Sequence, residues 1–246
     1  MRTKIIILTS VLMLAFISTS CLYYMRSGPE VCLEGSGNVV REARNVPFFT
    51  KVELRGQGNI YLSQANQHEL TLEVEDNLME IIETYVQNNV LIIEHPQYSC
   101  LNNKKPINYY ITMNDIEKLA VSGIGNIFGE QRIDTQKLDI LLSGSSTVNL
   151  MLEARNLRTI ISGVGDIRLK GRADVHEFVA SGYGNLKAFE FITHNTKIVI
   201  SGAGDVEAYA DENLNVTISG SGDVFYKGGA DVQSTISGSG IVQKTH

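Results

Sequence analysis

The seven residues from Ile161 to Ile167, ISGVGDI, decide the fold, because close variants of them recur along the chain. They return as ASGYGNL from Ala180 and as ISGAGDV from Ile200. With the looser copies included, the element begins at seven serines whose spacings are 21, 19, 19, 20, 18 and 18 residues: Ser122, Ser143, Ser162, Ser181, Ser201, Ser219 and Ser237. A period near 20 residues that persists over seven copies is typical of a solenoid, in which each repeat forms one coil.

The residues that flank the element show how each coil is built. The residue before each serine is apolar, and so is the residue after the Asn/Asp position, whereas the residue four before the serine is polar: Lys118, Asp139, Arg158, Glu177, Lys197, Asn215 and Gln233. Polar and apolar residues that alternate in this way indicate strands with one buried face. Each coil therefore has one strand that enters the glycine corner and one that leaves it.

A unit of this size cannot bury a core alone, so equivalent apolar positions must stack from coil to coil at about 4.8 Å. A β-propeller would need about 40 residues and four strands in each repeat. The sequence therefore predicts an all-β fold, a parallel β-helix with coils of about 19 residues, preceded by a less regular β portion.

The chain divides into four parts by its patterns. We expect a lipoprotein signal peptide at residues 1–20, an anchor or linker segment at 21–45, an irregular β portion at 46–116 and regular β-helix repeats at 117–246. The irregular portion is either a set of long-looped coils or a small cap over the solenoid end. Within it, Asn88 and Asn89 favour a hairpin turn with positive φ, and residues 76–84 could form a helical turn.

The first residues have the features of a targeting segment. Arg2 and Lys4 precede an apolar run, Ile5 to Ile17, that is short for a membrane span. Small residues then lead to Cys21, as in the lipobox of bacterial lipoproteins, although Ser18 stands where a Leu is usual. We expect export and lipidation at Cys21, which would anchor the protein in the cell envelope, with the outer membrane favoured. Cleavage at a plain secretory site and an uncleaved anchor helix are the alternatives.

Lipidation of Cys21 would leave two further cysteines, Cys32 and Cys100. In an oxidising compartment an even pair can form a disulfide. Two free buried thiols are the alternative, and the sequence does not decide between them.

The charge balance bears on partners. The formal net charge is −6, and loss of residues 1–20 would leave 19 basic against 27 acidic side chains. An acidic surface without a basic cluster disfavours nucleic acid as a partner.

The repeated Ser-Gly-x-Gly-Asn/Asp elements, the lipoprotein-like start and the stretch from Phe49 to Asn59 (FTKVELRGQGN) together resemble the head GIN domain family, a family labelled as auto-transporter adhesins. The resemblance covers about residues 46 to 242. It implies an exported β-helical protein of Gram-negative bacteria with adhesion as a conjectural role, and it carries over no catalytic residues. The chain shows no membrane-barrel translocator, so the auto-transporter part of the label does not extend to it.

The Asn/Asp position of the repeat is the sharpest candidate for chemistry. Stacked coils would bring Asp205 and Asp223 together, and two adjacent carboxylates could bind Ca²⁺. The simpler interpretation is that these residues bond their own backbone and shape the corner. We therefore expect no cofactor, with Ca²⁺ at Asp205 and Asp223 as the weak alternative.

Other polar groups give little sign of catalysis. A serine in every coil favours a ladder of hydroxyls that caps turns, and Ser-Gly-x-Gly is not a nucleophile elbow. We expect His176 and His194 on the surface. A polysaccharide lyase or hydrolase is the alternative function, with Asp166, Arg168, Asp205 and Asp223 as its charged groups, but the repeat already explains the spacing of these aspartates. We predict a protein that is not an enzyme.

Two hypotheses remain for a non-catalytic role. In the first, the third residue of the corner projects from the solenoid and contacts a glycan or protein ligand; its candidates are Gln57, Ile124, Val164, Tyr183 and Ala203. In the second, the protein is a structural module that assembles with itself through the C-terminal coil, from Thr235 to Gln243, because open β edges invite pairing.

Overall fold

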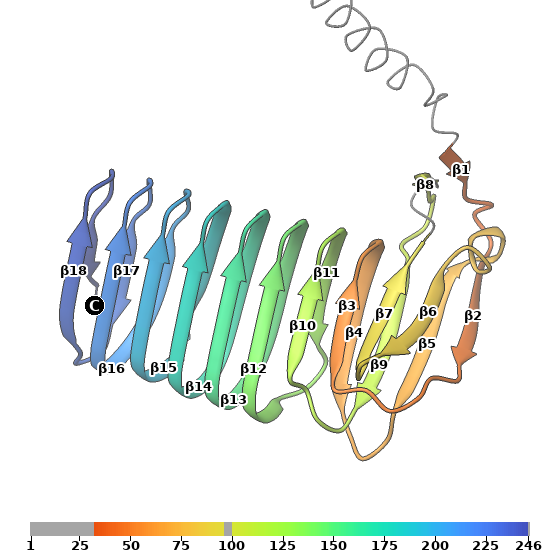
Figure 1. The fold of residues 1–246 in the computed structure, drawn as a ribbon, viewed down its shortest axis with the longest axis horizontal. Helices are drawn as coiled ribbons and strands as arrows, with labels where there is room; N and C mark the ends of the chain where they lie inside the picture. Colours follow the sequence, from red (N-terminus) through yellow and green to blue (C-terminus); the bar gives the residue numbers. More distant parts are fainter. Residues whose placement is uncertain (1–31, 96–99, 246) are drawn as a thin grey trace, which may run out of the picture.

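The computed structural model describes residues 32–95 and 100–245, and most of them lie in β-strands (Figure 1). In this part of the chain the one helix is the 3₁₀-helix η1 (Asp76–Leu78), and no helix is long and apolar enough to cross a membrane. The strands are β1 (Cys32–Glu34), β2 (Val39–Arg44), β3 (Lys51–Leu54), β4 (Gln57–Gln64), β5 (Glu69–Glu75), β6 (Glu83–Gln87), β7 (Val90–Glu94), β8 (Cys100–Asn102), β9 (Asn108–Met113), β10 (Lys118–Val121), β11 (Ile124–Gly129), β12 (Ile133–Leu142), β13 (Ser145–Ile161), β14 (Val164–Ala180), β15 (Tyr183–Ile200), β16 (Val206–Ile218), β17 (Val224–Lys227), β18 (Asp231–Ile236) and β19 (Val242–Lys244). The expected signal peptide and Cys21 lie outside the described residues.

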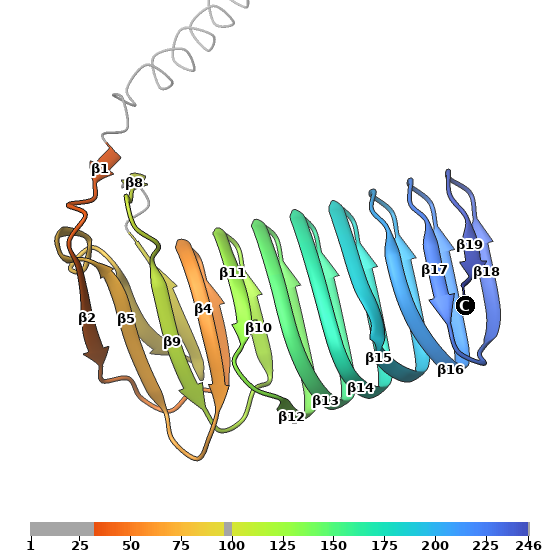
Figure 2. The ribbon, with the colours of Figure 1, turned by 180° about the vertical axis from the view of Figure 1, so that it is seen from behind.

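The regular part is a parallel β-solenoid, as predicted. Successive coils stack with their strands parallel, so that β13 pairs with β14 from Ser145 opposite Val164 to Ile161 opposite Ala180. Each coil makes its Ser-Gly corner at one edge of the solenoid and a return bend at the opposite edge (Figure 2).

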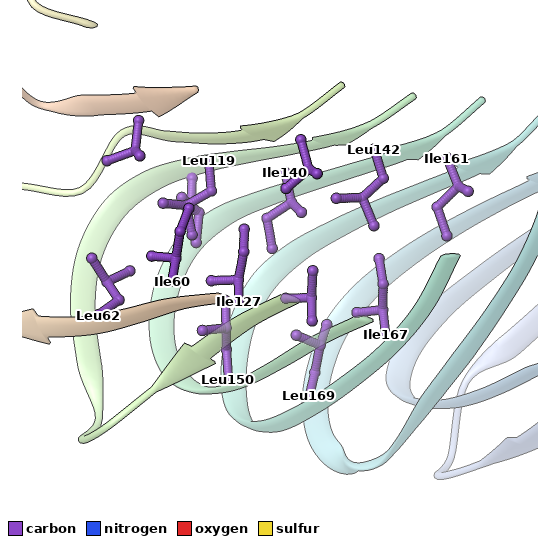
Figure 3. Close-up of a cluster of buried hydrophobic side chains, with 14 of the residues drawn as sticks. Ile60, Leu62, Leu119, Ile127, Ile140, Leu142, Leu150, Ile161, Ile167 and Leu169 are labelled. Atoms are coloured by element: carbon purple, nitrogen blue, oxygen red, sulfur yellow. The ribbon is translucent and has the colours of Figure 1, made fainter. Parts of the chain in front are cut away.

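The core lies between the two walls of the solenoid and consists of stacked apolar columns. In the first six corners of the repeat, the residue before the serine and the residue after the Asn/Asp position point inward, as expected, and are at most 1% exposed: Val121, Leu142, Ile161, Ala180, Ile200, Ile218, Ile127, Val148, Ile167, Leu186, Val206 and Val224. In the last corner, Ile236 is 42% exposed. Figure 3 shows several of these side chains facing each other between the walls. Stacking in one register thus makes a continuous apolar interior, because each column is repeated at every coil.

The first glycine of each corner is required by close packing between coils. A Cβ atom on Gly182 would lie 2.0 Å from the carbonyl oxygen of Gly163, and a Cβ on Gly163 would lie 2.1 Å from that of Gly144. Real Cβ atoms do not approach so closely, so only glycine lets the corners stack at this spacing. In the later coil at Gly204 the second glycine also has a positive φ of 133°.

The N-terminal end reverses the order of the coils. β3 pairs with β10 on one side and with β7 on the other, while β4 pairs with β11 and with β9, all in parallel. Residues 51–64 are therefore a coil of the solenoid, and β7 and β9 form the next coil outward although they follow in sequence. The stacking continues across the boundary expected at residue 117.

Antiparallel strands cover this end of the solenoid (Figure 1). β5 pairs antiparallel with β9 and with β2, and β6 with β7. The turn between β6 and β7 contains Asn88 and Asn89 with φ of 52° and 61°, which confirms the predicted hairpin. η1 is the helical turn considered for residues 76–84. Both proposals for the irregular portion are thus present, a long-looped coil and a cap.

Candidate functional site

The five residues predicted to form a binding face lie in a single row along the corner edge. Gln57 is opposite Ile124, and Val164 is opposite Tyr183, which bridges to Ala203. The same row contains three serines at the equivalent position, which the prediction left out although the motif marks them: Ser145, Ser221 and Ser239. We call this row of eight residues, together with the seven corner serines, the corner ridge.

The exposed apolar part of the corner ridge is its N-terminal half. The exposed fractions of Ile124, Val164 and Tyr183 are 66%, 51% and 51%. Gln57 differs, because its Nε2 donates to the carbonyl oxygen of Leu101 (3.2 Å) and to Oδ1 of Asn103 (2.6 Å). The first member of the row is thus engaged within the protein, and the next coils present apolar side chains to solvent.

The corner ridge carries no charge. Each corner from residue 122 onward is Ser-Gly followed by Ile, Ser, Val, Tyr, Ala, Ser or Ser. The seven corner serines are exposed, and within the described residues none of their hydroxyls has a hydrogen-bond partner. The expectation that they cap turns is therefore wrong; they form a row of free hydroxyls beside the apolar side chains.

The Asn/Asp side chains bond the next coil and not their own corner, which corrects the sequence-based interpretation. Oδ1 of Asn185 accepts the backbone N–H of Asp205 (3.0 Å), Oδ1 of Asp205 accepts that of Asp223 (3.2 Å), and Oδ1 of Asp223 accepts that of Ile241 (3.1 Å). At the near end of this run, Asn185 donates to Asp166 (2.8 Å). These side chains therefore supply acceptors between coils and strengthen the stacking.

The same bonds bear on the calcium and enzyme alternatives. Asp205 and Asp223 each use one carboxylate oxygen on a backbone N–H, and the described residues contain no group of three or more His, Cys, Asp or Glu that could hold a metal ion. Ca²⁺ usually takes six to eight oxygen ligands. Arg168 is exposed on the outer wall, and Asp166 accepts a bond from the ladder. The aspartates at 166, 205 and 223 thus have structural roles between coils, and Arg168 does not join them in a site.

His176 is in the core, contrary to the expected surface position. It is 1% exposed, its Nε2 lies 3.1 Å from the hydroxyl of Thr159, and its ring meets Phe191 edge-on. Burial lowers its pKa to about 4, because the charged imidazolium cannot be hydrated there. His194 is exposed, as expected, with Nδ1 3.9 Å from a carboxylate oxygen of Glu212. The two histidines form no pair.

The edge opposite the corner ridge holds an open groove with a volume of about 1630 Å³. We call it the polar groove. It is lined by residues 51, 88, 90, 115, 117–118, 134–137, 139, 153–155, 172–174, 192 and 194. Five Lys or Arg and six Asp or Glu side chains line it. The sequence did not predict this groove, because its lining comes from coils that are distant in the chain.

The N-terminal segment is fastened to the cap at several points. Cys32 is disulfide-bonded, and β1 pairs with β8 so that Cys32 is directly opposite Cys100. The carboxylate of Glu75, which is fully buried, accepts backbone N–H groups from Gly37 (2.6 Å) and Lys104 (2.9 Å). The role of Glu75 was not predictable from the sequence, in which it is the last residue of an alternating strand.

The comparisons with known proteins agree with this architecture. A model of the family described as "Putative auto-transporter adhesin, head GIN domain" matches residues 48–230. The chain belongs to the head GIN domain family. A search of curated proteins gives no match for this head GIN domain.

Three crystal structures share its fold. A putative adhesin from Bacteroides fragilis has 25% identity and a TM-score of 0.83, covering 87% of this chain and all of its own. One from Parabacteroides merdae has 21% identity and a TM-score of 0.68, covering 87% of this chain and 99% of its own. A protein from Parabacteroides distasonis, described as a putative lipid binding protein, has 18% identity and a TM-score of 0.69, covering 88% of this chain and all of its own.

Proposed function

We propose that this head GIN domain is the non-catalytic binding head of an exported lipoprotein and that the corner ridge is its contact surface for a protein partner. The observation that carries the proposal is the in-register row in which Ile124, Val164 and Tyr183 are more than half exposed and no member is charged. The centres of protein interfaces are depleted in charge and enriched in Tyr. The adhesin label of the family and of two of the solved structures supports a binding role.

Retention of coated beads under flow tests this proposal. Beads that carry the protein are passed over surfaces coated with fibronectin, collagen or mucin, and the force needed to release them is measured. We expect retention on at least one protein coat, and loss of about tenfold or more when Val164→Asp or Tyr183→Asp places a charge in the row. The matched control is Asn149→Asp, which adds the same charge at an exposed position on the outer wall.

Three outcomes would contradict the proposal. If the beads are not retained on any protein coat, the result contradicts a protein partner for the corner ridge. Equal losses for the ridge variants and Asn149→Asp would show that net charge, and not the ridge, governs retention. Retention on mucin that is lost after its glycans are removed would assign the ridge to a glycan.

Attachment through a lipid on Cys21 is the second part of the proposal, supported by the lipobox-like sequence before that residue. The protein would then be held in the envelope, with the outer membrane favoured, and the solenoid would extend from its N-terminal end. Metabolic labelling with a radioactive fatty acid should mark the wild-type protein and leave Cys21→Ser unlabelled. A labelled Cys21→Ser protein, or an unlabelled wild type, would contradict lipidation at this residue.

Self-assembly through the last coil is a second candidate function, and one observation favours it. Within the described residues β18 pairs with β16 and β19 with β17, each on one side, and Ile236 and Ile241 are 42% and 46% exposed. We propose that a second copy of the chain pairs with this edge. Light scattering should show a dimer that Ile236→Lys converts to a monomer; a wild type that is monomeric at high concentration would contradict this.

A further inference from the structure

We propose that the polar groove is a second binding site and that it takes an extended, electrically neutral glycan. The groove is lined by residues of the return bends. These bends lie at the opposite edge of the solenoid from the Ser-Gly corners (Figure 2). The lining residues of the groove come from successive coils at about the 4.8 Å strand spacing, and their type changes from coil to coil: Asp134, Glu153, Arg172 and Ile192 occupy one equivalent position. A linear polymer that lies along the solenoid axis would contact side chains of several successive coils.

The charges of the groove are mostly paired with one another. Arg172 contacts Glu153 (3.0 Å), Lys137 contacts Asp139 (3.3 Å), and Lys51 contacts Glu117 (3.4 Å). Paired charges leave little net field, which disfavours capture of a polyanion such as nucleic acid or a sulfated polymer. Their outer oxygens and N–H groups still accept and donate hydrogen bonds. Dense donors and acceptors without net charge suit the hydroxyls of a neutral sugar.

An exposed apolar side chain lies among the polar groups of the groove. Ile192 lines the groove and is 46% exposed, whereas Ala173, which stacks on Ala154, is 4% exposed and packs into the core. An exposed apolar side chain can contact the C–H groups of a sugar ring while the polar rows bind its hydroxyls.

Two groups in the groove have unused bonding capacity. Oδ1 of Asp139 is buried and has no hydrogen-bond partner among the described residues, and Lys118, directly opposite Asp139 in the parallel pairing, makes no ion pair with any described residue. Buried polar atoms are normally satisfied. A ligand hydroxyl that accepts from the Nζ of Lys118 would use this unpaired cation, and it could also donate to Oδ1 of Asp139 once a shift of neighbouring side chains uncovers that buried atom.

Affinity electrophoresis of the full-length protein tests the proposal with polymers cast in the gel. The probes are the neutral polymers laminarin, mannan and arabinoxylan, with polygalacturonate and heparin as acidic comparisons. We expect at least one neutral polymer to retard the protein and the acidic polymers to have no such effect. Asp139→Asn and Lys118→Ala should each weaken the retardation about tenfold, because each removes a bond to a charged group.

The controls separate the groove from the ridge and from folding. Arg168→Ala removes an exposed cation from the outer wall, outside the groove, and should leave the retardation unchanged. Tyr183→Asp, in the corner ridge, should also have no effect, so failure of the ridge proposal and of this one can be told apart. Should Asp139→Asn unfold, as its melting curve would show, Lys118→Ala carries the test alone. Retardation by no neutral polymer, by acidic polymers alone, or equally in all variants would overturn the proposal.

Discussion

Replacement of Glu75 by alanine should loosen the contact between residues 35–37 and the loop after β8 while the solenoid stays folded. The Glu75 side chain is fully buried at the end of β5, where its two oxygens accept the backbone N–H groups of Gly37 (2.6 Å), Lys104 (2.9 Å) and Lys105 (3.4 Å). It therefore joins residues that precede β2 to the loop that follows β8. A Cβ on Gly35 would lie 2.1 Å from the same carboxylate, so the segment is packed tightly onto it.

The magnitude follows from the bonds that are lost. A hydrogen bond to a charged group contributes about 1.5–3 kcal/mol, and a backbone N–H left without an acceptor adds its own desolvation cost. The two short bonds of Glu75 together give about 3–6 kcal/mol, and the bond at 3.4 Å adds little. Because coils interact mainly with their neighbours, the loss should remain local to the cap. Glu75→Gln keeps one acceptor oxygen and should lose roughly half as much.

Hydrogen exchange read by mass spectrometry measures this directly. In Glu75→Ala, exchange at the amides of Gly37 and Lys104 should accelerate by roughly a hundredfold or more, as about 3 kcal/mol requires. Amides of β14 should keep their rates. The matched control is Glu69→Ala, which removes an exposed carboxylate from the same strand. Unchanged rates at Gly37 in Glu75→Ala, or equal acceleration in Glu69→Ala, would refute the reasoning.

Three further predictions follow from the coils and the N-terminal segment. Gly182→Ala should lower the free energy of unfolding in urea by about 2–3 kcal/mol, because its Cβ would lie 2.0 Å from a carbonyl oxygen of the preceding coil. Ser181→Ala, the control, should change this free energy by less than about 0.5 kcal/mol. Similar unfolding midpoints for the two variants would contradict this prediction. The pKa of His176 is lowered to about 4 from an ordinary 6.5, so the unfolded chain binds the extra proton between these values, and stability that is complete above pH 6.5 should fall by about 3 kcal/mol as the pH approaches 4; the melting temperature of His176→Leu should lack this part of the acid dependence. Peptide mapping without reductant should recover Cys32 joined to Cys100, since the backbones of the two residues are directly opposite in β1 and β8; a free thiol on Cys100 would contradict the pairing.

The repeat made the regular coils predictable. In a parallel stack each position repeats at every coil, so apolar residues before the serine and after the Asn/Asp position had to face inward together, as Ile161 and Ile167 do. The corner ridge followed from the same logic, because the third residue of each corner occupies an equivalent position. The missing members, such as Ser145, were recoverable from the alignment itself.

The sequence-based predictions were wrong near the return bends, where the alternation of inward-facing and outward-facing residues breaks down. His176 stacks between Leu157 and Thr196, in a column whose other members include Leu138 and Leu214. Those leucines were a signal that the position faces inward, but a histidine seen alone resembles a surface residue. The Asn/Asp ladder was misassigned for a related reason, since bonds between coils leave no trace in the local sequence.

The N-terminal coils could not be ordered from the sequence. β7 and β9 follow β4 in the chain but stack outside it, which requires the long excursion through the cap. Nothing in the local pattern marks this reversal. The polar groove depends on it as well, because Lys51 and Lys118 become neighbours only when residues 51–64 stack against the coil that begins at β10.

Cysteine pairs cross-linked across the corner ridge test the central claim, that in-register stacking places these side chains in one row. Val164 and Tyr183 are on adjacent coils, about 4.8 Å apart along the axis, whereas Val164 and Ala203 are two coils apart. A short bifunctional thiol reagent should therefore link Val164→Cys with Tyr183→Cys efficiently and should not link Val164→Cys with Ala203→Cys. Efficient linkage of the second pair, or none of the first, would contradict the account.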